Sequence, residues 1–486
     1  MFRSLGSSIF TFLSVLLFAF VLVLIWNGSS GIQFQRIAME GDRSTAELVA
    51  EYRAKQAEEA ELARRGQDNE LTTTMTDPEP SDGGSGEGPA VVLWLSIPGF
   101  RGDYVQNADT STFDEFISEG AATNKMRPHF PCVTFPSHVT TATGAPVSAH
   151  GIVADKIRLE DGTLVENPAD PALLKAEPIW TTATRQEIPT LVHDWPLSWN
   201  QEGEHAAAAF LNEYNAEETD QARLEKALEA WRKGPGGEGD DAKFRLVMLR
   251  LDDIYRAGLV NGPREQPTYD AVTATDKAIG EFLETVRSEW NQLAPPDANL
   301  VVLVTTDHGM AELDKNVNLA QLLGEEMMKN CDVIAHDAVA NLYFKDLPEN
   351  EGESKLFTDA FDDELKKRIY FRTYTREELP EEWSYLHEGR VGDRILVLKG
   401  GYGFTEMEAS EPVFDPSEGP GFFGGYGYPV KESIRMSGQI MITGYPNPPT
   451  TGDLDEISQL VFHATVCKIL GIEPAETASK EGLDVR

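Results

Sequence analysis

The chain has 486 residues and a formal net charge of −38 at pH 7, with 80 acidic and 42 basic residues. This length suits one large domain or two ordinary ones. The acidic excess argues against nucleic acid as a partner, because a phosphate backbone would be repelled. The three cysteines have no metal-ligand spacing and predict no disulfide framework, and their odd number leaves at least one free thiol.

The amino-terminal segment contains a long apolar stretch. Residues 1–8 precede it, and residues 9–26 are apolar apart from Thr11 and Ser14. A charge-free stretch of this length is typical of one membrane-spanning helix, with Trp26 at an interface. The alternative is a cleaved signal peptide, but the stretch is long for one. We therefore predict a single-pass signal anchor, with residues 1–8 in the cytoplasm and the following domain extracytoplasmic, either periplasmic or extracellular.

Two connecting segments follow the predicted anchor. Residues 44–65 open with a capping box, Ser44 to Glu47, and continue as an Ala- and Glu-rich helix until Gly66. The apolar stripe of this helix is thin, which indicates a polar stalk or a helix that binds a protein partner. Residues 67–89 are rich in Asp, Glu, Gly, Ser, Thr and Pro, which is typical of a flexible acidic linker. The remaining chain, residues 90–486, is predicted to be globular.

Strands and helices alternate through this globular part. Apolar segments predict strands at Ala90 to Ile97, Arg245 to Leu251 and Leu300 to Thr305. Helical patterns occur at Phe113 to Glu119, Ala222 to Lys233 and Tyr269 to Glu289. This alternation predicts an α/β domain with a mostly parallel central sheet flanked by helices. Ligands in such folds bind beyond the carboxyl ends of the strands, which here are residues 96–99, 252–255 and 307–309.

The loop from His129 to His138 is a candidate nucleophile loop. Pro131 and Pro136 stiffen it and present the Thr134 hydroxyl on a rigid bend. A helix predicted from Val139 to Thr143 would direct its positive end toward this hydroxyl. Thr134 would need a metal or a base to act as a nucleophile. His138 and His150 are candidate bases, although lone histidines are more often structural. The alternative is a proline-braced turn with a capping threonine.

These segments resemble the alkaline phosphatase superfamily, and specifically its nucleotide pyrophosphatase/phosphodiesterase (type I phosphodiesterase) family. The resemblance covers residues 90 to 483 in order, and it implies an alkaline-phosphatase-like fold. It rests on the following stretches: Pro98–Tyr104, Phe130–Gly144, Ser148–Val153, Glu177–Ala183, Val302–Met310, Val391–Asp393, Gly424–Tyr428 and Leu470–Ala475.

The resemblance also implies two zinc ions, held by six side chains, with Thr134 as the nucleophile between them. Of the family's functional positions, Thr134, Asp307 and His308 carry the expected residue. The other positions are degenerate: Pro98 stands for the opening Asp ligand, Tyr255 and Leu259 for an Asp and a His, Tyr426 for the last His, and Asp155 for the Asn that helps to hold a phosphate oxygen.

These departures change the expected chemistry. Pro and Leu offer no donor, and a phenol with a pKa near 10 is a poor zinc ligand at neutral pH. A two-zinc centre is therefore not expected, while Asp307, His308 and Thr134 leave a weak single-zinc site open. A two-residue shift of the alignment would let Asp103, Asp252 or Asp253 supply a missing ligand. An ionised Asp155 accepts hydrogen bonds only and would repel phosphate.

Three functions remain open from the sequence. The first is a membrane-anchored phosphodiesterase-like pseudoenzyme that has lost two-zinc hydrolysis and binds a protein partner, through the stalk helix or the cleft rim, or an unidentified non-phosphate ligand. The second is a metal-dependent phosphodiesterase or nucleotide pyrophosphatase-type hydrolase that uses Thr134 with a reduced metal site. The third is a structural subunit of a membrane complex.

Overall fold

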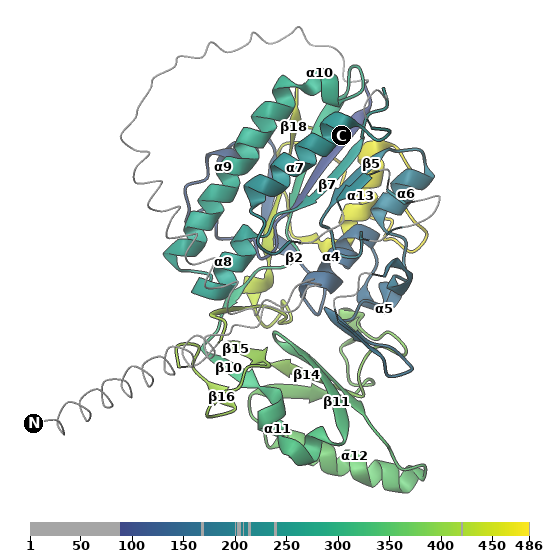
Figure 1. The fold of residues 1–486 in the computed structure, drawn as a ribbon, viewed down its shortest axis with the longest axis vertical. Helices are drawn as coiled ribbons and strands as arrows, with labels where there is room; N and C mark the ends of the chain where they lie inside the picture. The colour runs from purple at the N-terminus through teal and green to yellow at the C-terminus, as the bar shows by residue number, and fades with distance from the viewer. Residues whose placement is uncertain are drawn as a thin grey trace, which may run out of the picture.

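The computed structural model describes residues 88–166, 170–199, 201, 206–207, 209–211, 215–237, 241–418 and 421–485 (Figure 1). The predicted anchor at residues 9–26, the stalk at 44–65 and nearly all of the linker at 67–89 lie outside these residues. Within the described ranges, no helix is both long and apolar enough to cross a membrane.

A large central sheet organises the upper part of the molecule (Figure 1). The three predicted strands are its centre: β1 (Ala90–Ser96) lies between β7 (Leu246–Arg250) and β8 (Asn299–Thr305) and is parallel to both. The sheet has the order β19-β2-β18-β8-β1-β7-β5-β6, and β18 is antiparallel to β8 and to β2. The predicted α/β fold with a mostly parallel sheet is confirmed. The other strands are β2 (Ala121–Arg127), β5 (Thr190–His193), β6 (Ala209–Leu211), β18 (Gly438–Tyr445), β19 (Gly452–Asp453) and β20 (Ile457–Ser458), which pairs with β2.

Helices cover both faces of this sheet, so β1 is buried on both sides. Leu93 and Leu95 contribute to one core with α3 (Ser111–Glu119), α7 (Asp220–Lys233) and α9 (Gln266–Ser288). Val92 and Trp94 contribute to a second core with α4 (Thr134–Thr143), α6 (Ile179–Arg185) and α13 (Phe462–Leu470). Burial on both faces explains why the strand is a continuous apolar run. The remaining helices of the upper part are α5 (Val147–His150), α8 (Asp253–Asn261) and α10 (Trp290–Leu293).

A smaller lobe lies below the central sheet (Figure 1). Its core is an antiparallel sheet of order β11-β12-β14-β13. Its elements are β11 (Cys331–His336), β12 (Val339–Phe344), β13 (Phe371–Tyr374), β14 (Arg394–Leu398), α11 (Leu319–Met328) and α12 (Glu351–Lys366). Short strand groups connect the parts: β10 (Lys315–Asn318) with β15 (Tyr402–Thr405) and β16 (Val413–Phe414), β9 (Ala311–Glu312) with β17 (Gly424–Gly425), and β3 (Lys156–Arg158) with β4 (Leu164–Glu166).

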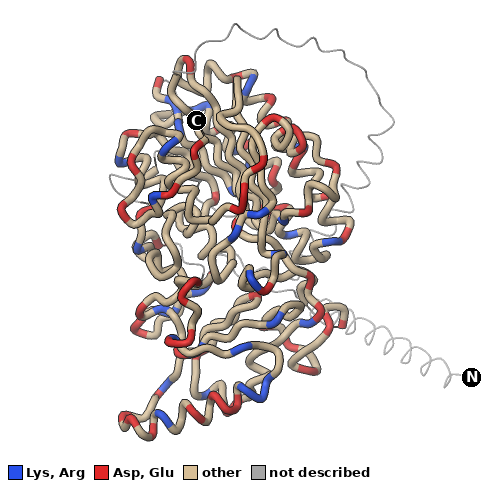
Figure 2. Tube along the Cα trace, turned by 180° about the vertical axis from the view of Figure 1, so that it is seen from behind, with Lys and Arg blue, Asp and Glu red and all other residues tan. Residues whose placement is uncertain are grey.

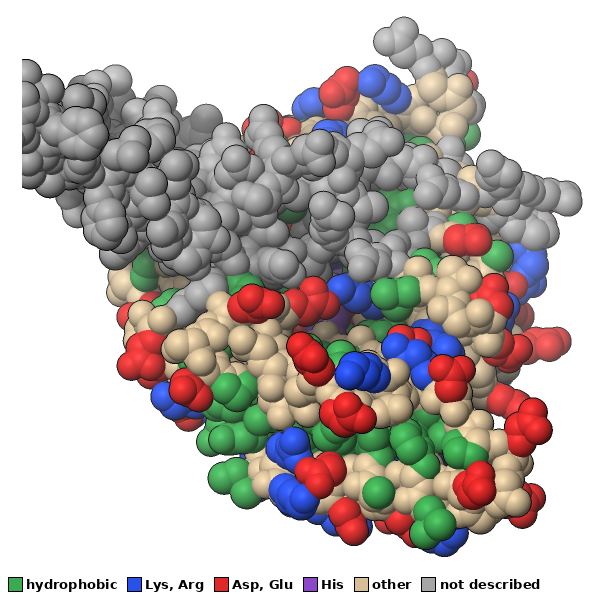
Figure 3. Space-filling model, turned by 60° about the horizontal axis from the view of Figure 1, so that its bottom comes forward, with side chains coloured by type: hydrophobic (Ala, Val, Ile, Leu, Met, Phe, Trp, Pro, Cys, Tyr) green, Lys and Arg blue, Asp and Glu red, His purple; other side chains and the backbone are tan. Residues whose placement is uncertain are grey.

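Acidic residues are distributed over both lobes, with Lys and Arg among them (Figure 2). Seen from the end that the smaller lobe occupies, apolar side chains lie between charged ones (Figure 3). Leu356 on α12 and Ile369 just after it are 70% and 69% exposed. Because the acidic residues occur on both lobes, the negative charge belongs to a broad solvated surface and is not confined to one segment.

Two histidines hold α4 in place as neutral hydrogen-bonding groups. His150 Nδ1 accepts the Ile152 N–H at 3.1 Å, and its other nitrogen lies 2.9 Å from the Thr140 hydroxyl. His463 Nε2 accepts the Ala475 N–H at 3.1 Å, so its Nδ1–H donates to the Ala142 carbonyl at 2.9 Å. Burial lowers the pKa of His150 to about 3 and that of His463 to about 4. His150 is therefore a structural group and is not placed to act as a base.

These two histidines predict acid sensitivity. Their folded-state pKa values lie below the unfolded value, so their contribution is complete above pH 6.5 and is lost as the unfolded chain takes up protons below it. Between the unfolded and folded pKa values, each histidine should lower the free energy of unfolding by about 1.4 kcal/mol for each unit by which the pH falls. Urea unfolding at pH 7, 6 and 5 measures this slope. His463→Gln keeps an acceptor for Ala475 without titrating, and a slope equal to that of the wild type would refute the assignment.

Candidate functional site

The carboxyl ends of the central strands meet, as the sequence predicted. The Gly99 N–H, just after β1, donates to Asp307 Oδ1 at 3.0 Å, and the His308 N–H donates to the same oxygen at 2.7 Å. Gly99 has a φ of +68°, and a Cβ there would lie 3.2 Å from Met310 Cε and 3.6 Å from Tyr255 Cα. This left-handed turn needs glycine because the segments after β1, β7 and β8 pack closely.

Asp307 and His308 keep the geometry of a ligand pair. His308 Nδ1–H donates to the Gly309 carbonyl at 2.7 Å, which leaves Nε2 as the ring nitrogen that faces Asp307. Nε2 lies 3.3 Å from Asp307 Oδ2. Among the described residues, neither of these two buried atoms has a hydrogen-bond partner. Two ligands of one tetrahedral zinc ion, each about 2 Å from it, would be about 3.3 Å apart.

Thr134 is the first residue of α4 and is 2% exposed. The helix thus begins earlier than the predicted Val139. The reason is that Pro136 falls in the first helical turn, where its missing N–H costs no hydrogen bond. His138 lies one turn later, and its Nδ1–H donates to the Thr134 carbonyl at 2.8 Å while Nε2 accepts from the Ser96 hydroxyl at 3.0 Å. Both nitrogens of His138 are therefore engaged away from the Thr134 hydroxyl.

Two tyrosines meet beside Thr134. The hydroxyls of Tyr255, on α8, and Tyr426, after β17, are 2.7 Å apart. The Tyr426 ring stacks on the His308 ring with centroids 4.2 Å apart and planes inclined by 17°. Burial, reinforced by the carboxylate of Asp337, raises the pKa of both phenols well above the ordinary value, while the nearby Thr134 hydroxyl acts against this rise at Tyr255. Both side chains are therefore neutral phenols.

Two further degenerate positions, Leu259 and Pro98, are buried and apolar. Leu259 is 4% exposed and belongs to one hydrophobic cluster with Tyr255, Met310 and Tyr426. This cluster continues into the core of the smaller lobe through Leu342 and Phe361, among others. Pro98 is also buried. Three of the positions that the resemblance assigned to zinc ligands, Tyr255, Leu259 and Tyr426, thus form part of a hydrophobic core.

Asp155 lies between α4 and the smaller lobe. Its Oδ1 accepts the Phe135 N–H at 2.8 Å, and its Oδ2 lies 3.1 Å from His336 Nε2. His336 ends β11, and its other nitrogen is paired with Asp337. Burial raises the pKa of Asp155, and the nearby His336 acts against this rise. Burial alone would lower the pKa of His336, but Asp155 and Asp337 raise it. The sequence interpretation missed His336 and Asp337, which no motif marks.

The three acids named as replacement ligands are engaged with arginines. Asp103 receives two hydrogen bonds from Arg101, at 2.8 and 2.7 Å. Asp252 pairs with Arg250 at 2.8 Å, and Asp253 pairs with Arg256. Across the part of the chain that the structure describes, no three His, Cys, Asp or Glu side chains are grouped so as to hold a metal ion.

The side chains at this site do not fit the two-zinc centre that the resemblance implied. Zinc prefers imidazole, thiolate or carboxylate donors. Neutral phenols that bond to each other, an aliphatic side chain and a proline supply none of these. Asp307 Oδ2 and His308 Nε2 are donors of the right kind, and the Thr134 hydroxyl lies beside Tyr255.

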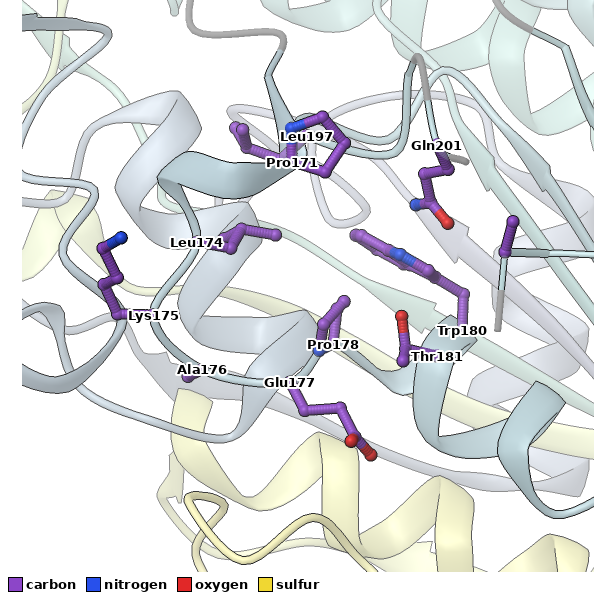
Figure 4. A pocket seen from close by; sticks show the side chains of 11 residues that line it. Pro171, Leu174, Lys175, Ala176, Glu177, Pro178, Trp180, Thr181, Leu197 and Gln201 are labelled. Atoms are coloured by element: carbon purple, nitrogen blue, oxygen red, sulfur yellow. The ribbon is translucent and has the colours of Figure 1, made fainter. Parts of the chain in front are cut away.

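A separate pocket of about 500 Å³ opens near α6 (Figure 4). Trp180 and Leu174 contribute to its apolar wall, and Glu177, Thr181 and Gln201 are among its polar lining residues. Neither Thr134 nor any of the degenerate positions lines it. The stretch Glu177–Ala183, which carries part of the resemblance, therefore lines a space apart from the candidate site.

Comparisons with known proteins agree with the fold. Solved structures of ectonucleotide pyrophosphatase/phosphodiesterase 5 share the fold: the murine protein is 22% identical with a TM-score of 0.64, covering 79% of this chain and 96% of that one. The human protein is 21% identical with a TM-score of 0.65, covering 79% and 95%.

Curated relatives are nucleotide pyrophosphatases and phosphodiesterases. A bis(5'-adenosyl)-triphosphatase of Mus musculus is 26% identical over a match covering 79% of this chain and 78% of that protein. An uncharacterized pyrophosphatase/phosphodiesterase of Schizosaccharomyces pombe is 24% identical, covering 67% and 66%. For ectonucleotide pyrophosphatase/phosphodiesterase family member 1 of Mus musculus, also 24% identical, the match covers 82% of this chain but only 42% of the relative.

The family match spans most of the described chain. The profile of the Type I phosphodiesterase / nucleotide pyrophosphatase family matches residues 92–426. This range runs from β1 to Tyr426 and contains Thr134, Asp307 and His308. The chain therefore belongs to the type I phosphodiesterase / nucleotide pyrophosphatase family.

Proposed function

We propose that this protein is a phosphodiesterase-like binding protein that has lost two-zinc hydrolysis. The observation that carries the proposal is the hydrogen bond between the hydroxyls of Tyr255 and Tyr426, 2.7 Å apart and inside a hydrophobic cluster. Both positions correspond to zinc ligands in the resemblance. Two neutral phenols satisfy each other here, and deprotonating either one in this buried place would be costly.

The carboxylates around Thr134 also oppose the binding of phosphate. Asp155 stands where the resemblance has an amide donor, and its carboxylate is 2% exposed. Asp337 and Asp307 add further carboxylates nearby. A phosphate ester entering without metal ions would meet several negative groups at short range, which opposes binding. We therefore propose that the ligand of this protein is a protein segment or a small molecule that carries no phosphate.

Metal analysis and a hydrolysis assay test the loss of activity. We expect purified protein, incubated with zinc and desalted, to retain less than about 0.1 zinc per chain, since most of the ligand set is gone. Turnover of bis-p-nitrophenyl phosphate should be the same for the wild type and for Thr134→Ala. Bound zinc together with turnover that Thr134→Ala abolishes would refute the proposal.

A second candidate is a hydrolase with one metal ion. It is favoured by the 3.3 Å separation of Asp307 Oδ2 and His308 Nε2, which suits two ligands of one ion, with Thr134 as a third donor. Asp307→Asn distinguishes the two candidates. In a one-metal enzyme this change abolishes both zinc retention and turnover, whereas in a binding protein it changes neither.

We also propose that residues 9–26 anchor the domain outside the cytoplasmic membrane and that a partner protein binds residues 44–65 or the cleft rim. Sequence supports this through the long charge-free stretch and the capped polar helix that follows. Deleting residues 44–65 from the full chain should release a co-purifying partner. Retention of the same partner after the deletion would assign partner binding to the globular domain. If no partner co-purifies with the full chain, the proposed partner binding is refuted, and so is the alternative that the protein is a structural subunit of a membrane complex.

A further inference from the structure

The amino terminus of α4 is buried, and the residue before it provides no side-chain acceptor for the free N–H groups of the first turn. All ten residues of the helix are buried. The residue before it, Val133, has no side-chain oxygen and makes no capping hydrogen bond. Exposed N–H groups at a helix start carry partial positive charge and attract anions. Because Pro136 has no N–H, the donors of the first turn are those of Thr134 and Phe135.

The chain supplies this anion from its own sequence. Asp155 lies 20 residues after Phe135, and its Oδ1 accepts the Phe135 N–H at 2.8 Å. We infer that the Asp155 carboxylate is a built-in ligand that fills an anion-binding site at the start of α4, and that His336 of the smaller lobe locks it there.

The lock depends on the contact between the two lobes. His336 and Asp155 are 3% and 2% exposed, and their nearest atoms are 3.1 Å apart. Asp337 pairs with the other nitrogen of His336, so the imidazole lies between two carboxylates. An external anion can reach the Phe135 N–H only by displacing a carboxylate and breaking this pair. Breaking a buried pair is strongly unfavourable, because each partner would be left uncompensated.

This inference deepens the proposed function, since a self-filled anion site explains how phosphate is kept out without metal ions. It predicts a gain of binding when the internal anion is removed. In Asp155→Asn, the negative charge is removed, the side-chain amide can donate as well as accept, and His336 loses one of its two carboxylate partners. The helix start, the amide and His336 then suit a small oxyanion.

Calorimetric titration with inorganic phosphate tests the gain. We expect Asp155→Asn to bind phosphate at least tenfold more tightly than the wild type. Asp161→Asn is the matched control: Asp161 is exposed, caps a turn through the Thr163 N–H at 2.9 Å, and its replacement changes the net charge equally. This control should bind as weakly as the wild type. Equal binding by the wild type and Asp155→Asn, or no binding by a folded Asp155→Asn, would overturn the inference.

A second measurement covers the case in which Asp155→Asn fails to fold. His336→Gln keeps the Asp155 carboxylate but removes the imidazole that lies against it. Hydrogen exchange of the Phe135 amide should then become at least tenfold faster than in the wild type, while Asp161→Asn leaves it unchanged. Unchanged exchange in His336→Gln would show that the pair locks nothing. Zinc retention and phosphodiester turnover are read separately, so failure of the proposed function is distinguishable from failure of this inference.

Discussion

Zinc binding is expected to appear when the four degenerate ligand positions receive the family's residues, in the combined variant Pro98→Asp, Tyr255→Asp, Leu259→His and Tyr426→His. With Asp307 and His308 this variant has six donors around Thr134. It should retain about two zinc ions per chain after desalting, whereas the wild type retains none. Without zinc, the variant should be much less stable than the wild type, because charged and polar groups replace part of a hydrophobic core.

The control variant changes the same four positions to similar residues that do not bind zinc, with Asn in place of Asp and Gln in place of His. It introduces similar polarity but no carboxylate or imidazole. Thermal unfolding with and without zinc is the readout, because a ligand that binds only the folded state raises its stability. A folded family variant that behaves like this control would mean that Tyr255, Leu259 and Tyr426 are not the family's ligand positions.

The Tyr426 ring is expected to be a large single contributor to stability at the site. Tyr426→Ala removes the hydrogen bond to Tyr255, the stacking on His308 and the packing against Leu259 and Met310. Replacing a buried aromatic ring with alanine lowers the free energy of unfolding by about 3–5 kcal/mol. Urea unfolding at pH 7 measures this loss.

Tyr426→Phe separates the hydroxyl from the ring. It keeps the stacking and the packing but leaves the Tyr255 hydroxyl without this partner, so a loss of about 1–2 kcal/mol is expected. If Tyr426→Ala and Tyr426→Phe lose the same small amount, the ring is not part of the core and the cleft is open to solvent. That result would also remove the main argument against metal binding.

The two tyrosines satisfy each other's polar groups inside a hydrophobic cluster. A buried polar group is tolerated when it has a hydrogen-bond partner. Tyr255 and Tyr426 provide one for each other, and their rings fill the space beside Met310 and Leu259.

The central strands and the site loops were predictable because their signals are local. Strands β1, β7 and β8 are continuous apolar runs, and each ends in a polar or glycine-containing turn. Parallel neighbours end at the same edge of a sheet, which brought Gly99 and Asp307 together as expected. The smaller lobe was not anticipated as a separate sheet, although β12 and β14 are rich in apolar residues, because short apolar strands carry little information about their partners.

By itself, the sequence determined the α/β fold and the family, because these depend on local pattern and on motif order, whereas the assignment of Tyr255 and Tyr426 to ligand positions stays a prediction. Only the tertiary structure decided what those side chains do. Tyr255 and Tyr426 are 171 residues apart in the chain, and His336 reaches Asp155 from another lobe. Such contacts depend on how sheets and lobes dock, and no local preference of the chain encodes them.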